Sequence, residues 1–212
     1  MMVRHRFFFT NVNKEENWIN EYINRGYRLI DMNSLTRSYK FERSTDNNVK
    51  PTVKIDFRVF KKQEDFEDYI SIFEDSGWKH IAGSMSNGTQ YFERANEDAS
   101  EDIFSDHLSK AERSKRISDM WLGTFWAFIP TVVVFYCTGI LDVKKIIHIK
   151  ELYYTPGLWD MKGFDFWRAF LFETPFALGR GFVGFLFLFI VLAYGYFGVK
   201  SLYWYYKERN IK

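Results

Sequence analysis

Four histidines and a single cysteine are the side chains best suited to nucleophilic or metal chemistry in this chain of 212 residues. His5, His80, His107 and His148 show no metal-ligand spacing, and Cys137 stands alone inside a hydrophobic run. The sequence contains neither a phosphate-binding glycine loop nor a Gly-x-Ser-x-Gly turn. We therefore predict that the protein is not an enzyme and binds neither a metal nor another cofactor.

Asp56 is the acidic residue with the most unusual setting. Many of the other acids occur in adjacent pairs on a predicted helix, 64–76, where they form a solvated face. Asp56 instead follows Ile55 within an apolar and basic strand. It either forms an ion pair with Arg58 or Lys54 or marks a binding cleft, and the ion pair is the favoured interpretation.

Aromatic residues make up 20% of the chain and supply the remaining candidates for binding. We expect six of them to form a core shared by the helices and sheet of a soluble domain: Trp18, Tyr22, Tyr27, Tyr69, Phe73 and Trp78. The alternative is that they line a ligand pocket. The candidate binding residues are therefore Trp18, Tyr27, Asp56 and Trp78.

The N-terminal region, 1–95, repeats itself at an offset of 51 residues. Gly26 matches Gly77, and the triplet Phe-Glu-Arg at 41–43 recurs at 92–94. Matches that hold one register over a long stretch indicate an internal duplication.

Each copy is predicted to be a βαββ unit. The first has a strand at 4–10, a helix at 14–25 that Gly26 ends, and strands at 27–32 and 35–43. The second has a strand at 53–60, a helix at 64–76 that Gly77 ends, and strands at 78–84 and 89–94. We expect an α+β domain with one mostly antiparallel sheet and both helices on a single face, loosely ferredoxin-like.

Two long uncharged runs follow this domain, at 120–141 and 181–199. A helix needs about 20 apolar residues to cross roughly 30 Å of hydrocarbon. The second run continues to 206 through aromatic residues that suit a membrane interface. We predict a two-helix transmembrane hairpin, 120–141 and 181–206, joined by a loop at 142–180. Within that loop, 164–178 either lies at the membrane surface or packs as an ordered loop on the helix ends.

Small residues in both runs predict close packing of the two helices, because they let helix backbones approach in lipid. The expected packing positions are Gly123, Ala127, Thr131, Gly184, Gly195 and Gly198.

A charged linker, 96–119, joins the soluble domain to the first helix. Its basic residues either sit against anionic head groups or only set the topology, and the second interpretation is favoured. The candidate membrane-surface residues are Lys110, Arg113, Lys115 and Arg116. Eight basic residues flank the hairpin and six lie in its loop, which favours termini on the inside. With no signal peptide and no disulfide partner for the cysteine, we predict a two-pass cell-membrane protein with both termini cytoplasmic.

Several residues of the repeated region together resemble a known family. They are Trp18, the pair Gly26-Tyr27, the stretch YISIFEDSGW at 69–78, and the pair Tyr91-Phe92. The chain resembles, over 4–94, a bacterial membrane family catalogued as domain of unknown function 2812. Members of that family are often encoded beside a PadR-type transcription regulator. The resemblance implies a membrane-tethered partner in a regulatory pair, and it supplies no catalytic residue.

The expected function is regulatory interaction: a membrane-anchored head that binds a protein partner, with the lipid bilayer as its second contact. A net charge of only +2 gives no basic field for direct nucleic-acid binding. The alternative is a membrane-tethered sensor of a small ligand or lipid. A third is a membrane enzyme, whose sign would be polar residues converging at the membrane surface, such as His107 with Asp106 or His148 with Glu151.

Overall fold

The structure is a computed structural model that describes residues 1–44, 52–96, 98–142 and 148–210. The chain divides into two compact units. The first, here called the head unit, comprises Met1–Met120 together with Phe197–Lys212. The second, here called the hairpin unit, comprises Trp121–Tyr196. Two of the six loop cations counted above, Lys144 and Lys145, lie outside the described residues.

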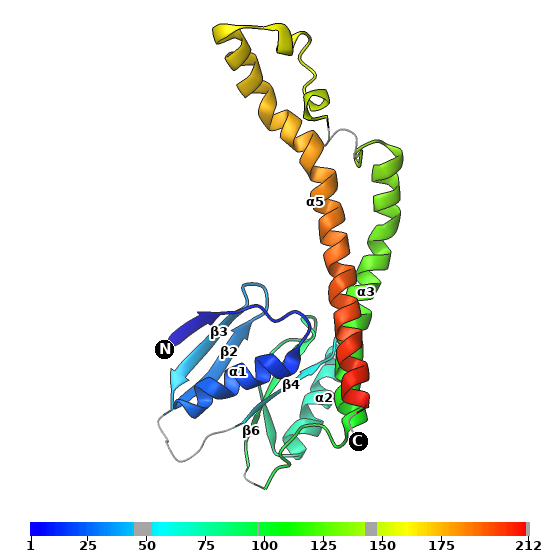
Figure 1. Ribbon diagram of the computed structural model, residues 1–212. Coiled ribbons are helices and arrows are strands. Elements are labelled where there is room, and N and C mark those ends of the chain that lie inside the picture. Colours follow the sequence, from blue (N-terminus) through cyan, green and yellow to red (C-terminus); the bar gives the residue numbers. More distant parts are fainter. Residues whose placement is uncertain (45–51, 97, 143–147, 211–212) are drawn as a thin grey trace. The chain divides into compact units, whose positions relative to one another are not determined.

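The head unit begins with one βαββ segment. Its elements are β1 (Met2–His5), α1 (Val12–Asn24), β2 (Tyr27–Asn33) and β3 (Ser38–Arg43). The three strands form an antiparallel sheet in the order β1-β3-β2, and Figure 1 shows α1 beside it. The predicted order of elements is confirmed, although β1 lies nearer the N-terminus than expected.

A second segment repeats that order. Its elements are β4 (Val53–Phe57), α2 (Gln63–Asp75), β5 (Trp78–Ala82) and β6 (Thr89–Arg94). The strands pair in the order β4-β6-β5, again with the last strand in the centre. The strand prediction at 89–94 coincides with β6.

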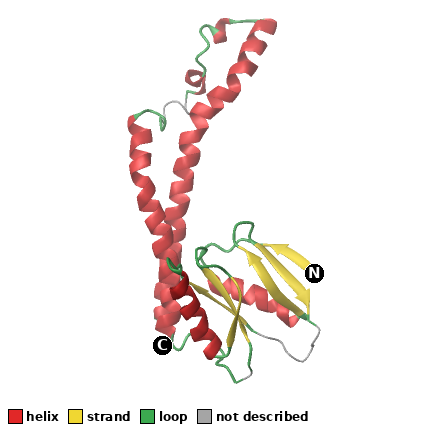
Figure 2. Ribbon diagram, turned by 180° about the vertical axis from the view of Figure 1, so that it is seen from behind, coloured by secondary structure: helices red, strands yellow, loops and turns green. Residues whose placement is uncertain are grey.

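The prediction of one continuous sheet is wrong, since the strands form two three-stranded sheets, both visible in Figure 2. Strands β2 and β5 lie side by side, yet no hydrogen-bond ladder joins them. Each has a register shift, between Leu29 and Asp31 in β2 and between His80 and Ala82 in β5. Such irregularities bend a strand and disrupt pairing along it.

Both helices of these segments end where glycine permits a left-handed turn. Gly26 has φ +86° and Gly77 has φ +83°, in the region that side chains with a Cβ rarely adopt. Their N–H groups donate to Ile23 O and Glu74 O, at 2.9 and 3.0 Å. At the start of α1, the Asn11 side chain accepts from Lys14 N at 3.0 Å. The predicted helix ends are confirmed.

The buried aromatic residues form two clusters rather than the one shared core expected. The first gathers Trp18 and Ile19 from α1, strand residues of both sheets, and Tyr91. Helix α1 contacts β2 and β4, so it holds the two sheets together. The second cluster is smaller and lies under α2, around Tyr69, Trp78 and Phe92.

Two long helices make up most of the rest of the chain. Helix α3 (His107–Cys137) has 31 residues and α5 (Gly163–Arg209) has 47. The described part of the segment between them contains two short 3-10 helices, η1 (Ile149–Leu152) and η2 (Leu158–Asp160). Both long helices are apolar enough over a sufficient length to cross a bilayer, which indicates a membrane protein by length and composition.

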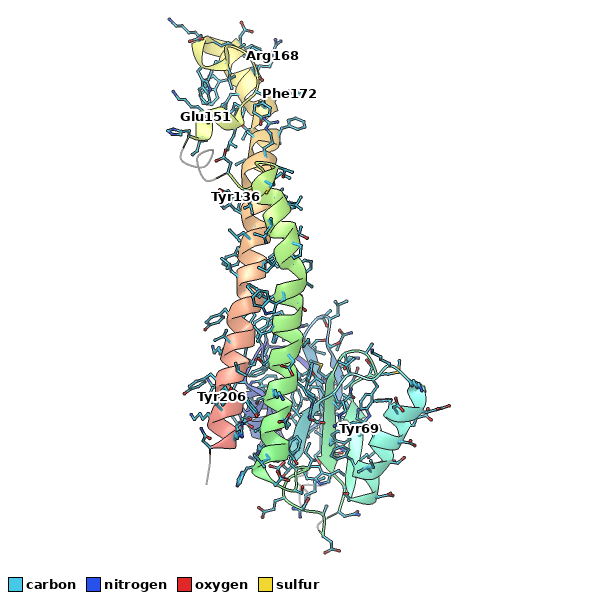
Figure 3. The ribbon with its side chains drawn as sticks, turned by 90° about the vertical axis from the view of Figure 1, so that its right-hand side faces the viewer. Tyr69, Tyr136, Glu151, Arg168, Phe172 and Tyr206 are labelled. Carbon is cyan, nitrogen blue, oxygen red and sulfur yellow. The ribbon has the colours of Figure 1, made fainter. Side chains whose placement is uncertain are left out.

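The expected boundary between linker and first transmembrane helix does not exist as a break, because α3 runs through it. The segment 164–178, expected as part of a loop, is helical and forms the first turns of α5. The preceding segment packs on it: Arg180 donates to Leu152 O at 2.6 Å, and Tyr154 N donates to Glu173 at 3.0 Å. Figure 3 labels Glu151, Arg168 and Phe172 at this end of the hairpin unit.

Candidate functional site

One face of α1 carries four polar side chains, of which Asn17 is exposed and the other three are partly or fully buried in the head unit. Asn13, Glu16, Asn17 and Asn20 are three or four residues apart, so the helical turn places them on one side. Asn20 pairs with the backbone of Val53 in both directions, at 2.9 and 3.0 Å. Glu16, which is 4% exposed, accepts from Ile55 N at 3.0 Å. This face thus binds α1 to strand β4.

Arg113 of α3 is fully buried against the same face. Its Nη1 donates to Glu16 Oε1 at 2.6 Å and to Ile55 O at 2.5 Å, and its Nη2 donates to Asn13 Oδ1 at 2.9 Å. The guanidinium also lies over the Phe104 ring, 5.3 Å from its centroid. Removing a charge from water is costly unless it is paired and hydrogen-bonded. These contacts pair the charge and satisfy both Nη atoms, whereas the buried Nε has no hydrogen-bond partner among the described residues.

The C-terminal end of α5 joins the same network through Glu208. Asn13 Nδ2 donates to Glu208 Oε1 and Ser114 Oγ donates to Oε2, both at 2.7 Å. Nearer the apolar run, Ser118 Oγ of α3 donates to Gly198 O of α5 at 2.9 Å. We call the contacts of Arg113, Glu16, Asn13, Glu208 and Ser114 the polar joint. It connects α1 and β4 to the ends of both long helices.

A second, partly buried ion pair ties α3 to the second sheet. Arg116 Nη2 donates to Asp56 Oδ1 and its Nε donates to Phe57 O, both at 2.6 Å. The other oxygen of Asp56 accepts from the Tyr69 hydroxyl at 2.8 Å. Burial, and then the nearby charge of Asp56, raise the pKa of Tyr69 well above its ordinary value. The tyrosine therefore stays protonated and donates.

Glu15 is a buried carboxylate held by two tyrosines. Tyr39 Oη donates to Glu15 Oε1 at 2.7 Å, and Tyr91 Oη donates to the same oxygen. Burial raises the pKa of Glu15 above its usual value, although both hydroxyls oppose that shift. Burial and the Glu15 charge together raise the pKa of Tyr39 and of Tyr91.

A polar cavity of about 360 Å³ lies beside the polar joint. Its lining comes from four elements: Asn13, Glu16, Asn17, Lys54, His107, Lys110 and Glu208. Asp102 stands next to it and pairs with two of the cations, Lys110 at 2.8 Å and Lys54 at 3.5 Å. Burial raises the pKa of Asp102, but the Lys110 hydrogen bond and the Lys54 charge outweigh it and lower the pKa overall.

A comparison with known protein families shows to which family the chain belongs. Residues 11–126, more than half of the chain, match the family described as "Protein of unknown function (DUF2812)". The chain belongs to the DUF2812 family. Neither the curated proteins nor the solved structures gave a match.

The DUF2812 match confirms the resemblance and moves its boundaries. It begins at Asn11 rather than Arg4 and continues past Arg94 to Trp126. The family region thus includes α1 and the first two-thirds of α3, and with them the contact between Glu16 and Arg113. Glu208, at the other end of the polar joint, lies beyond the match.

The structure places the four candidate binding residues of the DUF2812 head in its interior or at its edge. Trp18, 8% exposed, belongs to the first core cluster and Trp78, 1% exposed, to the second, while Tyr27 packs at the edge of the first. The polar cavity is lined by none of them. Asp56 forms the ion pair that the sequence favoured, but its partner is Arg116 rather than Arg58 or Lys54.

The four basic residues expected at the membrane surface have different environments. Lys115 is half-exposed and weakly paired with Glu112 at 3.9 Å. Lys110 lines the polar cavity and Arg116 pairs with Asp56. The prediction is wrong for Arg113, because its side chain is fully buried in the head unit and pairs with Glu16 instead of a lipid head group.

Small residues contribute to helix packing on α5 but not at two positions on α3. A Cβ at Gly195 would lie 3.1 Å from the Phe125 ring, and one at Gly184 would lie 2.7 Å from Ile140 O. Gly198 is buried and accepts from Ser118, whereas Thr131 is only partly buried.

Gly123 and Ala127 do not pack against α5, so those two predictions are wrong. Both are exposed, and a Cβ at Gly123 would meet nothing within 4 Å. Larger side chains of α3 occupy the contact instead: Trp121 lies 5.3 Å from Tyr194, and Phe135 lies 5.1 Å from Phe187, between ring centroids. At about 100° per residue, Gly123 falls on the opposite side of α3 from these rings.

Four residues of the site were not predicted from the sequence: Asn13, Glu16, Asn17 and Glu208. The first three have ordinary helix-surface character in the sequence, and only their common spacing indicates a shared face. Glu208 has a clearer signal, because it is an acid between Lys207 and Arg209 in the last turn of a helix. An anion is disfavoured at a helix C-terminus, so its presence there indicates a specific contact.

Proposed function

We propose that this DUF2812 protein is a two-pass, non-enzymatic regulatory protein of the cell membrane whose cytoplasmic head binds a protein partner. The observation that carries the proposal is the polar joint, which fastens the head to the ends of both apolar helices. A head that served only as cargo on an anchor would need no such buried contacts.

The joint supports signal transfer because it resists independent movement of its parts. Breaking a buried ion pair such as Arg113–Glu16 leaves an unpaired charge, at a cost of about 3–5 kcal/mol. A shift of α3 or α5 along its axis therefore displaces α1 and β4 as well. A partner bound on the head would therefore act on the ends of both long helices, which belong to the same unit.

The joint also supports a hairpin with both ends on one side of the membrane. The first residues of α3 and the last residues of α5 belong to the same head unit, as two antiparallel crossings require. The proposed side is the cytoplasm, on the basis of the flanking Lys and Arg residues. Cysteines introduced at Leu35 and at Trp159, both exposed, test this orientation. Membrane-impermeant thiol reagents should label the two positions from opposite sides of the membrane.

We further propose that the head arose by duplication of a ferredoxin-like βαββ unit. The pairing Tyr27↔Arg43 in the first sheet corresponds to Trp78↔Arg94 in the second, at the repeat offset of 51. The register shifts of β2 and β5 fall at the same offset. A shared irregularity is stronger support than a shared order of elements, because regular pairing recurs by chance more readily.

The experiment that tests partner binding is crosslinking of the tagged full chain in native membranes, followed by mass spectrometry. The family resemblance makes a PadR-type transcription regulator the first partner to look for. We expect one protein to be enriched over an unrelated two-pass membrane protein tagged in the same way. That protein should then bind the purified full chain in detergent.

A matched pair of variants adds a functional control. Arg113→Met disrupts the polar joint, and Lys115→Met changes an exposed pair on the same helix. The proposal predicts reduced crosslinking to the partner for the first variant and unchanged crosslinking for the second. Recovery of only those proteins that the unrelated control also captures would refute partner binding.

A further inference from the structure

Among the described residues, the buried carboxylate of Glu208 has no cation as its partner. It is 7% exposed and accepts from Asn13 and Ser114, which are neutral donors. Its sequence neighbours turn elsewhere: Lys207 Nζ lies over the Trp204 ring, and Arg209 lies over Tyr205. Within the described part of the chain, no ion pair involves Glu208. Burial and the helix C-terminus both disfavour this negative charge, so a cation at this position would be stabilised.

The side of the cavity formed by β4 and α3 has the opposite imbalance. Lys54 and Lys110 share the single carboxylate of Asp102, which leaves one positive charge in excess. Glu16, the remaining charged lining residue apart from His107, is already neutralised by Arg113. Counting the residues that the structure describes, the polar cavity is therefore electrically asymmetric, with a carboxylate from α5 that has no paired cation and one ammonium in excess on the side of β4 and α3.

We propose that the polar cavity binds a soluble zwitterion of amino-acid size. The ligand's ammonium group pairs with Glu208, and its carboxylate pairs with Lys54 and Lys110. The amides of Asn13 and Asn17 supply neutral hydrogen-bonding groups beside them. A volume of about 360 Å³ fits a small ligand and lies at the lower end of the range typical of binding pockets, roughly 300–1,000 Å³.

The position along the helices favours a soluble ligand over a lipid head group with the same charges. Glu208 lies nine residues beyond Val199, where the uncharged run of α5 ends. At 1.5 Å per residue this places its backbone roughly 14 Å further along the helix axis. Asn17 and His107 are exposed while Glu16 and Glu208 are buried, so the cavity extends inward from the surface of the head unit.

Occupancy of this cavity would bear on the polar joint, because Asn13, Glu16 and Glu208 belong to both. A ligand held there contacts α1, β4, α3 and α5 at once. This proposal goes beyond partner binding and does not depend on it, since ligand affinity is measured on the protein alone.

The test is ligand binding to the purified full chain in phosphatidylglycerol nanodiscs. The probes are the twenty standard L-amino acids, screened by thermal shift and then by calorimetry. Each amino acid that binds is compared with its decarboxylated amine and its deaminated acid. We expect saturable binding of at least one amino acid, with at least tenfold weaker binding of both analogues. Binding of none, or equal binding of an amine or acid analogue, overturns the proposal without reference to any variant.

Variants locate the site, each with a control on a nearby exposed position. Glu208→Gln and Lys110→Gln should each weaken amino-acid binding at least tenfold, whereas Glu112→Gln and Lys115→Gln should leave it unchanged. Unchanged affinity in Glu208→Gln would place the ligand elsewhere. A last experiment adds phosphatidylethanolamine to the nanodiscs. If that lipid stabilises the wild type but not Glu208→Gln, and no amino acid binds, the ligand of the cavity is a lipid head group rather than a soluble zwitterion.

Discussion

Replacement of Arg113 by methionine is the perturbation whose effect follows most directly from the structure. The variant keeps an unbranched side chain but leaves the Glu16 carboxylate without its cation, and Ile55 O and Asn13 Oδ1 without donors. Removing one partner of a buried ion pair costs about 3–5 kcal/mol. We therefore expect the free energy of unfolding of the head unit to fall by that amount.

Lys115→Met is the matched control. Lys115 lies two residues further along α3 and pairs with Glu112 at 3.9 Å, with nearly half of each side chain exposed. Exposed pairs contribute about 0–1 kcal/mol, so this variant should unfold almost as the wild type does. Pulse proteolysis of the full chain in detergent, over a urea series, measures both values.

A double variant separates the ion pair from the general effect of substitution. Glu16→Met removes the charge that Arg113→Met leaves unpaired, so the two changes together should cost less than the sum of their separate costs. Contacting residues commonly show coupling of about 0.5–3 kcal/mol. A loss below about 1 kcal/mol for Arg113→Met, or additive losses in the double variant, would refute the burial of this guanidinium.

Three further predictions concern the head and the hairpin. Glu15→Gln should gain stability relative to the wild type as pH rises from about 4.3, because the raised pKa of Glu15 makes the wild type lose stability between the unfolded-state and folded-state pKa values of this carboxyl. Urea midpoints of both proteins at acidic and neutral pH measure the difference in stability, and a pH-independent difference would contradict the prediction. Tyr69→Phe removes the hydrogen bond to Asp56 and should cost about 1–3 kcal/mol in urea unfolding, against almost nothing for Tyr22→Phe; equal losses would exclude a special role for the Tyr69 hydroxyl. Gly184→Ala should lower the thermal midpoint in detergent relative to Gly123→Ala, because both gain helix propensity but only the first meets a backbone oxygen; the opposite ranking would exclude the close approach at Ile140.

Local features of the head could be read from the sequence because they depend on neighbouring residues. Helix ends at Gly26 and Gly77 follow from the conformations open to glycine, and strand β6 follows from its turn and its alternation. The two apolar runs could also be predicted from the sequence, since length and composition alone identify them. The break between the two sheets could not be predicted from the sequence, because it depends on how β2 and β5 meet across the fold.

The candidate site could not be derived from the sequence for a similar reason. Arg113, Lys115 and Arg116 are equivalent as basic residues before an apolar run, yet their side chains range from fully buried to half-exposed. Asn13 and Glu208 are separated by 195 positions and meet only because α1 and the end of α5 share the head unit. Burial of a charge is decided by such distant partners, and a single sequence does not name them.

Hydrogen exchange of the full chain in nanodiscs tests most directly that the head and the ends of both long helices form one unit. Peptides from 107–119 and 198–208 should be protected together with peptides from β3 and β6, and Arg113→Met should accelerate exchange in all four regions. If 107–119 exchanged like an isolated helix while the strands stayed protected, the head would be only tethered, and the polar joint would not couple it to the membrane.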